Sequence, residues 1–324
     1  MKQNLTFEEE KRREFIYVLF NAVFVCVCIV FVLNFLVGAL CGKIYSDSPV
    51  HNDFLDNLLR SFLLAAVLVA PFVFYASRSD ISLKNVLKPR KLNTFWMIFG
   101  TIAVTGSSVF IVLLTEKAVS FLGSFGYVIN EYTPYVFGKS SDDIISLVFL
   151  SLFSSLSCEL VFRGILTERF RRANTGLALI IPALIASGLT GSLVRMPYVF
   201  VSGLLLSWIY MKTSSVYTVF FVSFIRDMSL YTIFLFKDEL SDNMLICVLV
   251  GLIASAAGFV PLVVRYGIRT VYPAPRDDDD EYMRMSGREA VSGVLKAFSF
   301  WIFIFGIVFT IYFFYLSNPT VELP

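Results

Sequence analysis

The stretch SCELVFRGILTERFRR, residues 157–172, places a carboxylate and a guanidinium inside a segment that is otherwise apolar enough for lipid. Glu159 and Arg163 are four residues apart, so on a helix they share one face and can form an ion pair. An ionisable side chain within a membrane span is costly unless it is paired, and such residues are therefore candidates for a functional role. The basic end of the stretch, ERFRR, is typical of the cytoplasmic end of a span.

The composition of the whole chain is that of a polytopic membrane protein. Of the 324 residues, 57% are hydrophobic and 16% are charged. A soluble domain has about 45–50% apolar and about 25% charged residues. We therefore expect an all-α fold, a polytopic transmembrane helical bundle. We find no internal repeat, Gly-rich phosphate loop or nucleic-acid motif in the sequence.

Hydropathy predicts about nine spans, because crossing the apolar core of a bilayer takes about 20 residues of helix. The predicted spans are residues 15–41, 57–76, 94–115, 143–166, 175–191, 196–211, 214–235, 244–264 and 296–316. The fifth and sixth are short and are separated only by GSLVR, which predicts an antiparallel helical hairpin.

The spans divide the chain into four parts. These are a cytoplasmic tail at 1–14, three spans with their connections at 15–142, a core at 143–235, and two C-terminal spans at 236–324. Lys and Arg concentrate in the tail and in every even-numbered connection, which predicts a cytoplasmic N-terminus; nine spans then put the C-terminus on the opposite side.

The last even-numbered connection, residues 265–295, contains the acidic run 277–281. Four consecutive Asp beside Arg and Pro are typical of a solvated cytoplasmic loop. A calcium site there would lack the ligand spacing of an EF-hand.

A second pair of ionisable residues, Arg226 and Asp227, lies in the seventh predicted span. Adjacent helix positions point about 100° apart, so we expect these two side chains to pair poorly with each other and at least one of them to need a partner on another helix. Glu159 with Arg226 is the pair we expect. At this point two interpretations are open: an ionic latch between the fourth and seventh spans, or a site that binds or processes something.

The stretch 157–172 resembles the first motif of the CPBP family of intramembrane metalloproteases, which includes the CAAX prenyl endopeptidases and bacteriocin-processing and immunity proteins. That motif has the form E-E-x-x-x-R and is very often followed by Gly. Arg163 and Gly164 match its end and Glu159 matches its second Glu, whereas Cys158 stands in place of the first Glu.

Two further stretches resemble the family. ALIIPALIASGLTGSL is similar to its second motif region, F-x-x-x-H, with Ala186 and Thr190 at those two positions. VFVSGLLLSWIYMKTSSVYTVFFVSFIRD is similar to its GLLLGWLYxRTGS stretch and the following H-x-x-x-N helix, with Ser223 at the His position and Asp227 at the Asn position. The resemblance covers about residues 143–235 and makes this part a CPBP-like core.

The resemblance implies a catalytic centre in a membrane cavity, where one Glu and two His activate a water with a divalent metal such as zinc. The only His of the chain, His51, is expected in an outer loop, so both family His and the first Glu are absent. Cys158, Glu159 and Asp227 are the remaining zinc donors, but neighbours on one helix converge poorly, and a Cys158 nucleophile would lack a base. We therefore expect no cofactor.

The sequence thus predicts a CPBP-family membrane protein with degenerate catalytic motifs. The expected site residues are Glu159, Arg163 and Asp227, with the degenerate positions Cys158, Thr190 and Ser223. We expect a binding, immunity or assembly factor whose partners are the lipid bilayer and a membrane segment, lipidated peptide or partner membrane protein, and no nucleic acid. Two alternatives stay open: an active CAAX-type endopeptidase with an atypical centre, and a transporter or channel subunit.

Overall fold

The structure is a computed structural model of the chain, and it describes residues 7–47, 53–79, 83–87, 93–123, 141–192, 194–235, 244–266 and 286–311. Every secondary-structure element in these ranges is a helix, which confirms the predicted all-α fold. Helices satisfy their backbone hydrogen bonds internally, as a chain within a bilayer must do.

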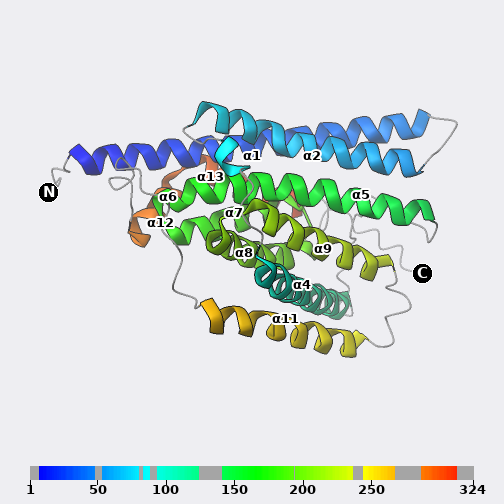
Figure 1. Ribbon diagram of the computed structural model, residues 1–324. Coiled ribbons are helices and arrows are strands. Elements are labelled where there is room, and N and C mark those ends of the chain that lie inside the picture. Colours follow the sequence, from blue (N-terminus) through cyan, green and yellow to red (C-terminus); the bar gives the residue numbers. More distant parts are fainter. Residues whose placement is uncertain are drawn as a thin grey trace.

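Six long helices form a row in Figure 1. Helices α1 (Phe7–Asp47) and α2 (Asp53–Arg78) cross at the top of the view, and below them follow α5 (Ser141–Cys158), α9 (Val216–Leu235), α4 (Thr94–Gly123) and α11 (Met244–Tyr266). The order in space differs from the order in the chain, because α5 and α9 lie between α2 and α4. The central helices of the row are therefore enclosed on both sides by other helices.

The remaining helices complete the bundle. Helix α5 runs on directly into η1 (Glu159–Thr167) and α6 (Glu168–Ala173), and the short α3 (Leu83–Val86) contacts η1. Helices α7 (Thr175–Leu189) and α8 (Arg195–Thr213) pack on each other, while α12 (Gly287–Lys296) and α13 (Phe298–Ile311) pack against α1.

Six described helices are long and apolar enough to cross a membrane, and they correspond to six of the nine predicted spans. Their apolar segments are Tyr17–Asn34, Asn57–Arg78, Thr94–Val119, Ile144–Ala173, Val216–Ile233 and Ile246–Tyr266. The pair α12–α13, bent by 69°, would make a seventh. Helix α7 is too short, with 15 residues, and α8 is not among the helices that are long and apolar enough to cross a membrane. A multi-pass membrane bundle is confirmed, and by length and composition it has six or seven spans in the described ranges.

Helices α7 and α8 form the predicted antiparallel hairpin. Gly191, in the turn between them, has a φ of 61°, a left-handed conformation that suits glycine. Small residues bring the two helices close together, because a Cβ added to Gly203 would lie 2.9 Å from the Cβ of Ala183. This close approach places the Gly203 backbone in the interior of the bundle, where it becomes part of the site.

Basic helix ends gather at one end of the bundle, at the left in Figure 1. Lys212, near the end of α8, donates a hydrogen bond of 3.4 Å to the carbonyl of Tyr266 at the end of α11. Arg171 of α6 lies 3.4 Å from the hydroxyl of Ser214, just after α8. The Arg169 guanidinium sits 4.9 Å from the ring centroid of Phe15 near the beginning of α1. These contacts bring the ends of α6, α8 and α11 and the beginning of α1 to the same end of the bundle.

Glycines allow α4 and α11 to pack backbone to backbone. A Cβ on Gly106 of α4 would collide with the backbone of Ser255, and a Cβ on Gly258 of α11 would collide with the backbone of Ala103. Association of helices in lipid depends on this kind of close packing, since no hydrophobic effect drives it there. The glycines therefore hold the outermost helix of the row in place.

We expect Gly258→Ala to destabilise the protein by about 1–3 kcal/mol, the usual cost of overpacking a rigid contact. The matched control is Gly306→Ala, because a Cβ at Gly306 meets nothing within 4 Å. Thermal unfolding in detergent is the measurement. Equal melting temperatures for the two variants would contradict the packing described here.

Candidate functional site

The E-x-x-x-R-G sequence lies in η1, a π-helical segment of nine residues within an otherwise α-helical span. The Thr167 hydroxyl donates to the carbonyl of Phe162, five residues earlier, at 2.8 Å. Eight of the nine residues are buried, so the segment is enclosed by protein rather than by lipid. π-Helical turns are rare and occur mostly at functional sites, which makes this segment the natural place to look for one.

Glu159 and Arg163 form the ion pair that their spacing predicts. The Arg163 Nε lies 3.2 Å from Glu159 Oε2, and its Nη1 donates to Oε1 at 3.3 Å. The side chains are 0% and 3% exposed, respectively. The remaining nitrogen, Nη2, donates to the Gly203 carbonyl of α8 at 3.1 Å. The pair is therefore fully desolvated, and it ties η1 to the α7–α8 hairpin.

Arg226 pairs with Asp227, its neighbour in the chain, and here the sequence-based expectation is wrong. Arg226 donates to Asp227 Oδ1 from Nη2 at 2.7 Å and from Nε at 2.9 Å. The side chain of arginine is long enough to fold back along its own helix, so the 100° between adjacent positions does not keep the two charges apart. Arg226 therefore takes Asp227 as its ion-pair partner, in place of the expected Glu159.

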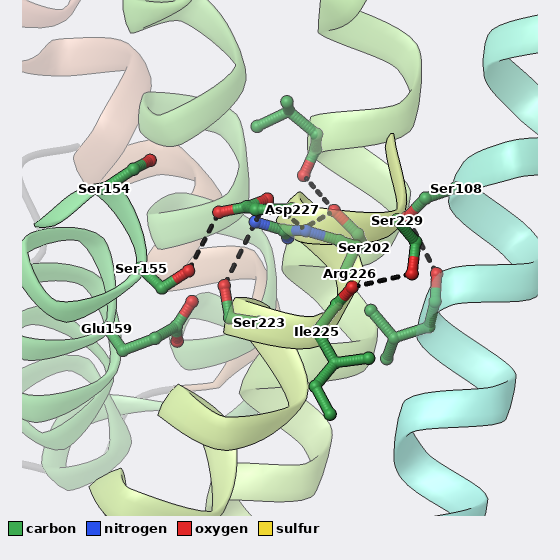
Figure 2. Close-up of polar contacts among 12 residues, drawn as sticks. Ser108, Ser154, Ser155, Glu159, Ser202, Ser223, Ile225, Arg226, Asp227 and Ser229 are labelled. Carbon is green, nitrogen blue, oxygen red and sulfur yellow. Dashed lines mark hydrogen bonds and ion pairs between the residues drawn. The ribbon is translucent and has the colours of Figure 1, made fainter. Parts of the chain in front are cut away.

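Three serines extend this second pair across the bundle (Figure 2). Ser155 of α5 donates to Asp227 Oδ2 at 2.9 Å. Arg226 donates from Nη1 to Ser202 of α8 at 3.1 Å and from Nη2 to Ser223 of α9 at 3.0 Å. Both carboxylate oxygens and all three guanidinium nitrogens thus have partners. Three helices are joined through one charge pair, and the cross-helix partner of Asp227 is a hydroxyl.

A cavity of about 280 Å³ lies between the two ion pairs. Five of the site residues expected from the sequence line it: Cys158, Glu159, Arg163, Thr190 and Asp227. The sixth, Ser223, is fully buried, accepts a hydrogen bond from Arg226 and is not among the lining residues. Residues from α5, η1, α7 and α9 therefore face one space, as the resemblance implies.

Five polar residues of this cavity had no signal in the sequence. They are Asn34 of α1, Ser154 of α5, Arg195 and Tyr198 of α8, and Tyr231 of α9. Each lies in an apolar stretch or a turn, so only the folded bundle shows that they meet. The wall between them is apolar and includes Val30, Leu64, Leu68 and Phe162. The cavity thus offers scattered hydrogen-bonding groups on a lipid-like surface.

The donors around the cavity do not fit zinc. In the described part of the chain, no three His, Cys, Asp or Glu side chains lie close enough together to hold a metal ion. Glu159 is paired with Arg163, and both oxygens of Asp227 are hydrogen-bonded. His51 and the acidic run 277–281 lie outside the described residues. A catalytic zinc needs three protein ligands and an open position, which this set does not supply.

Residues 140–229 match the sequence model of the Rce1-like family, described as type II CAAX prenyl endopeptidase Rce1-like. The matched region runs from the start of α5 into α9 and contains both ion pairs and all six expected site residues. It confirms the family resemblance drawn from the motifs. No curated protein and no solved structure matches the chain.

Proposed function

We propose that this multi-pass membrane protein of the Rce1-like CAAX protease family, matched over residues 140–229, binds a membrane-embedded peptide segment in its cavity and does not hydrolyse it. Such binding would serve an immunity or assembly role, in which a partner protein or a lipidated peptide is held within the bilayer.

One observation carries the proposal: each carboxylate at the cavity is already paired with an arginine. Glu159 lies 3.2 Å from Arg163, and Asp227 lies 2.7 Å from Arg226. A general base must be able to accept a proton from water. A carboxylate held by a buried guanidinium is a poor base, because protonating it would leave the buried arginine charge without its partner. The arrangement therefore favours structural use of both carboxylates.

The cavity lining supports binding of a peptide. The amide of Asn34 offers a donor and an acceptor to backbone groups of an extended or locally unwound segment. Backbone polar groups without partners are very costly within a bilayer, so a site that supplies partners favours such a segment. The apolar residues of the cavity wall can contact the apolar side chains of that segment.

Binding can be measured with two fluorescent probes in proteoliposomes, a farnesylated CAAX-type peptide and a synthetic transmembrane peptide. We expect at least one of them to bind the wild type and to lose most of its affinity in Thr190→Trp, which fills the cavity. The control is Phe74→Trp, on a 63% exposed position of α2. If neither probe binds, or if binding is equal in the two variants, the cavity is not a peptide site.

An active endopeptidase is the second candidate, and one observation favours it. Cys158 and Glu159 stand side by side at the motif positions of the two family Glu residues, and both line the cavity. Binding alone does not separate this candidate from the first, whereas turnover does.

A further inference from the structure

We propose that a second intramembrane pocket, on the opposite face of α9, holds one acyl chain of a membrane lipid. The pocket has a volume of about 560 Å³ and lies between α4, α9 and α11. The pocket lies partly outside the region that matches the family, because α4 and α11 are not within residues 140–229. The inference does not depend on the proposed function of the first cavity.

Helix α9 separates the two sites. Arg226 and Asp227 face the first cavity, whereas Ile225 and Ser229 line the pocket. Figure 2 shows this division, with Ile225 and Ser229 on the side of Ser108 of α4 and Asp227 toward Ser155 of α5. The pocket is therefore a distinct space, and an occupant of it need not touch the charged cluster.

The pocket is continuous with the lipid-facing surface of the bundle. Its wall is almost wholly apolar, and its rim includes Ile102, which is 37% exposed, and Ile246 and Val250, each 59% exposed. On the same helix as the last two, Ile253 is 66% exposed. The surroundings of such residues in a membrane protein are acyl chains, so an acyl chain is the molecule that adjoins the opening.

Two hydroxyls in the pocket point to a ligand with a hydrogen-bonding group. Thr101 and Thr105 line it, one helical turn apart, and their Oγ1 atoms are buried with no hydrogen-bond partner among the described residues. Other hydroxyls of the same helix, such as those of Ser108 and Thr115, donate to the carbonyl four residues earlier. An acyl carbonyl would give the Thr101 and Thr105 hydroxyls the acceptor that they lack.

The pocket is elongated. Along α4 its lining runs from Thr101 to Glu116, which is about 22 Å at 1.5 Å per residue. A single extended acyl chain has this elongated form.

The test uses the full chain in proteoliposomes containing phosphatidylcholine with a photoreactive diazirine in one acyl chain. After irradiation, peptide mapping by mass spectrometry locates the label. We expect labelling to concentrate on pocket residues of α4, α9 and α11. Val250→Trp, at the rim, should reduce that labelling at least threefold. The control Ile253→Trp, which is equally apolar and exposed on the same helix, should leave it unchanged.

Two further arms make the outcome decisive. Thr101→Val with Thr105→Val should reduce pocket labelling if the hydroxyls bind the acyl carbonyl, with thermal unfolding showing that the variant is folded. Label spread evenly over all lipid-facing helices, or equal labelling in Val250→Trp and Ile253→Trp, would overturn the site. Preferential labelling by a diazirine-bearing isoprenoid alcohol, supplied in a parallel experiment, would overturn the assignment of an acyl chain.

Discussion

Asp227→Leu is expected to lower the free energy of unfolding by about 3–5 kcal/mol, the usual cost of leaving one partner of a buried ion pair alone. In the wild type, Asp227 accepts two hydrogen bonds from Arg226, at 2.7 and 2.9 Å, and one from Ser155. Without it, the guanidinium retains the hydroxyls of Ser202 and Ser223 and a weaker interaction with the Glu159 carboxylate. Thermal unfolding in detergent micelles measures the loss.

A double variant separates the ion pair from simple loss of packing. Asp227→Leu combined with Arg226→Met removes both charges, and we expect it to recover most of the lost stability, since replacing a whole buried pair is much less costly than breaking it. Asp227→Leu as stable as the wild type would show that the charge of Arg226 does not need this partner. A double variant no more stable than the single one would show that something other than the pair is responsible.

Glu159→Gln is expected to lower the free energy of unfolding by a similar amount and to reduce the folded yield in detergent. Arg163 is 3% exposed, and without Glu159 its charge would be left with the Gly203 carbonyl. The neutral amide keeps the size of the side chain, so a loss of stability would report the charge itself. The measurement is the fraction of monodisperse protein after purification, together with the melting temperature.

The matched control for Glu159→Gln is Glu14→Gln, the same substitution at an exposed position of α1. We expect it to change stability by less than about 0.5 kcal/mol, as exposed charges generally do. Adding Arg163→Gln to Glu159→Gln should restore much of the yield. Unchanged yield and melting temperature in Glu159→Gln alone would count against a structural role for the pair.

Local sequence rules predicted those features of the site that depend on one helix. The four-residue spacing of Glu159 and Arg163 placed them on one face, and the pair is present in the fold. The π-helical form of η1 was not predicted, because the segment has no Pro, Gly pair or other local signal that distinguishes it from the rest of the span. The order of the motifs, rather than any local pattern, predicted that Cys158, Thr190 and Asp227 face one space.

Features that depend on several helices were the ones that sequence reasoning missed. Ser155 and Ser202 look like small polar residues of ordinary spans, yet both bind the Arg226–Asp227 pair. Helix geometry alone predicted that the adjacent charges Arg226 and Asp227 pair poorly, although the length of the arginine side chain permits a good pair. The predicted count of nine spans included α7 and α8 as full spans; α7 is short, with 15 residues, and the two pack on each other as a hairpin.

The two ion pairs and the cavity between them are the basis of the proposed binding function. In this chain the charged pairs hold η1, α8 and α9 together, and the rest of the cavity wall combines aliphatic side chains with single polar and aromatic ones. The cavity therefore remains open, while the two carboxylates at its wall are paired with arginines. This division of roles is what the proposed binding function requires.

The most direct test of this account is a cleavage assay on the purified full-length protein in proteoliposomes. The substrates are the farnesylated CAAX-type peptide and the transmembrane peptide, each with and without added zinc, and mass spectrometry identifies the products. We predict binding without any product above that of empty liposomes. Product that forms with the wild type and disappears in a folded Glu159→Ala variant would contradict the account and establish an active endopeptidase.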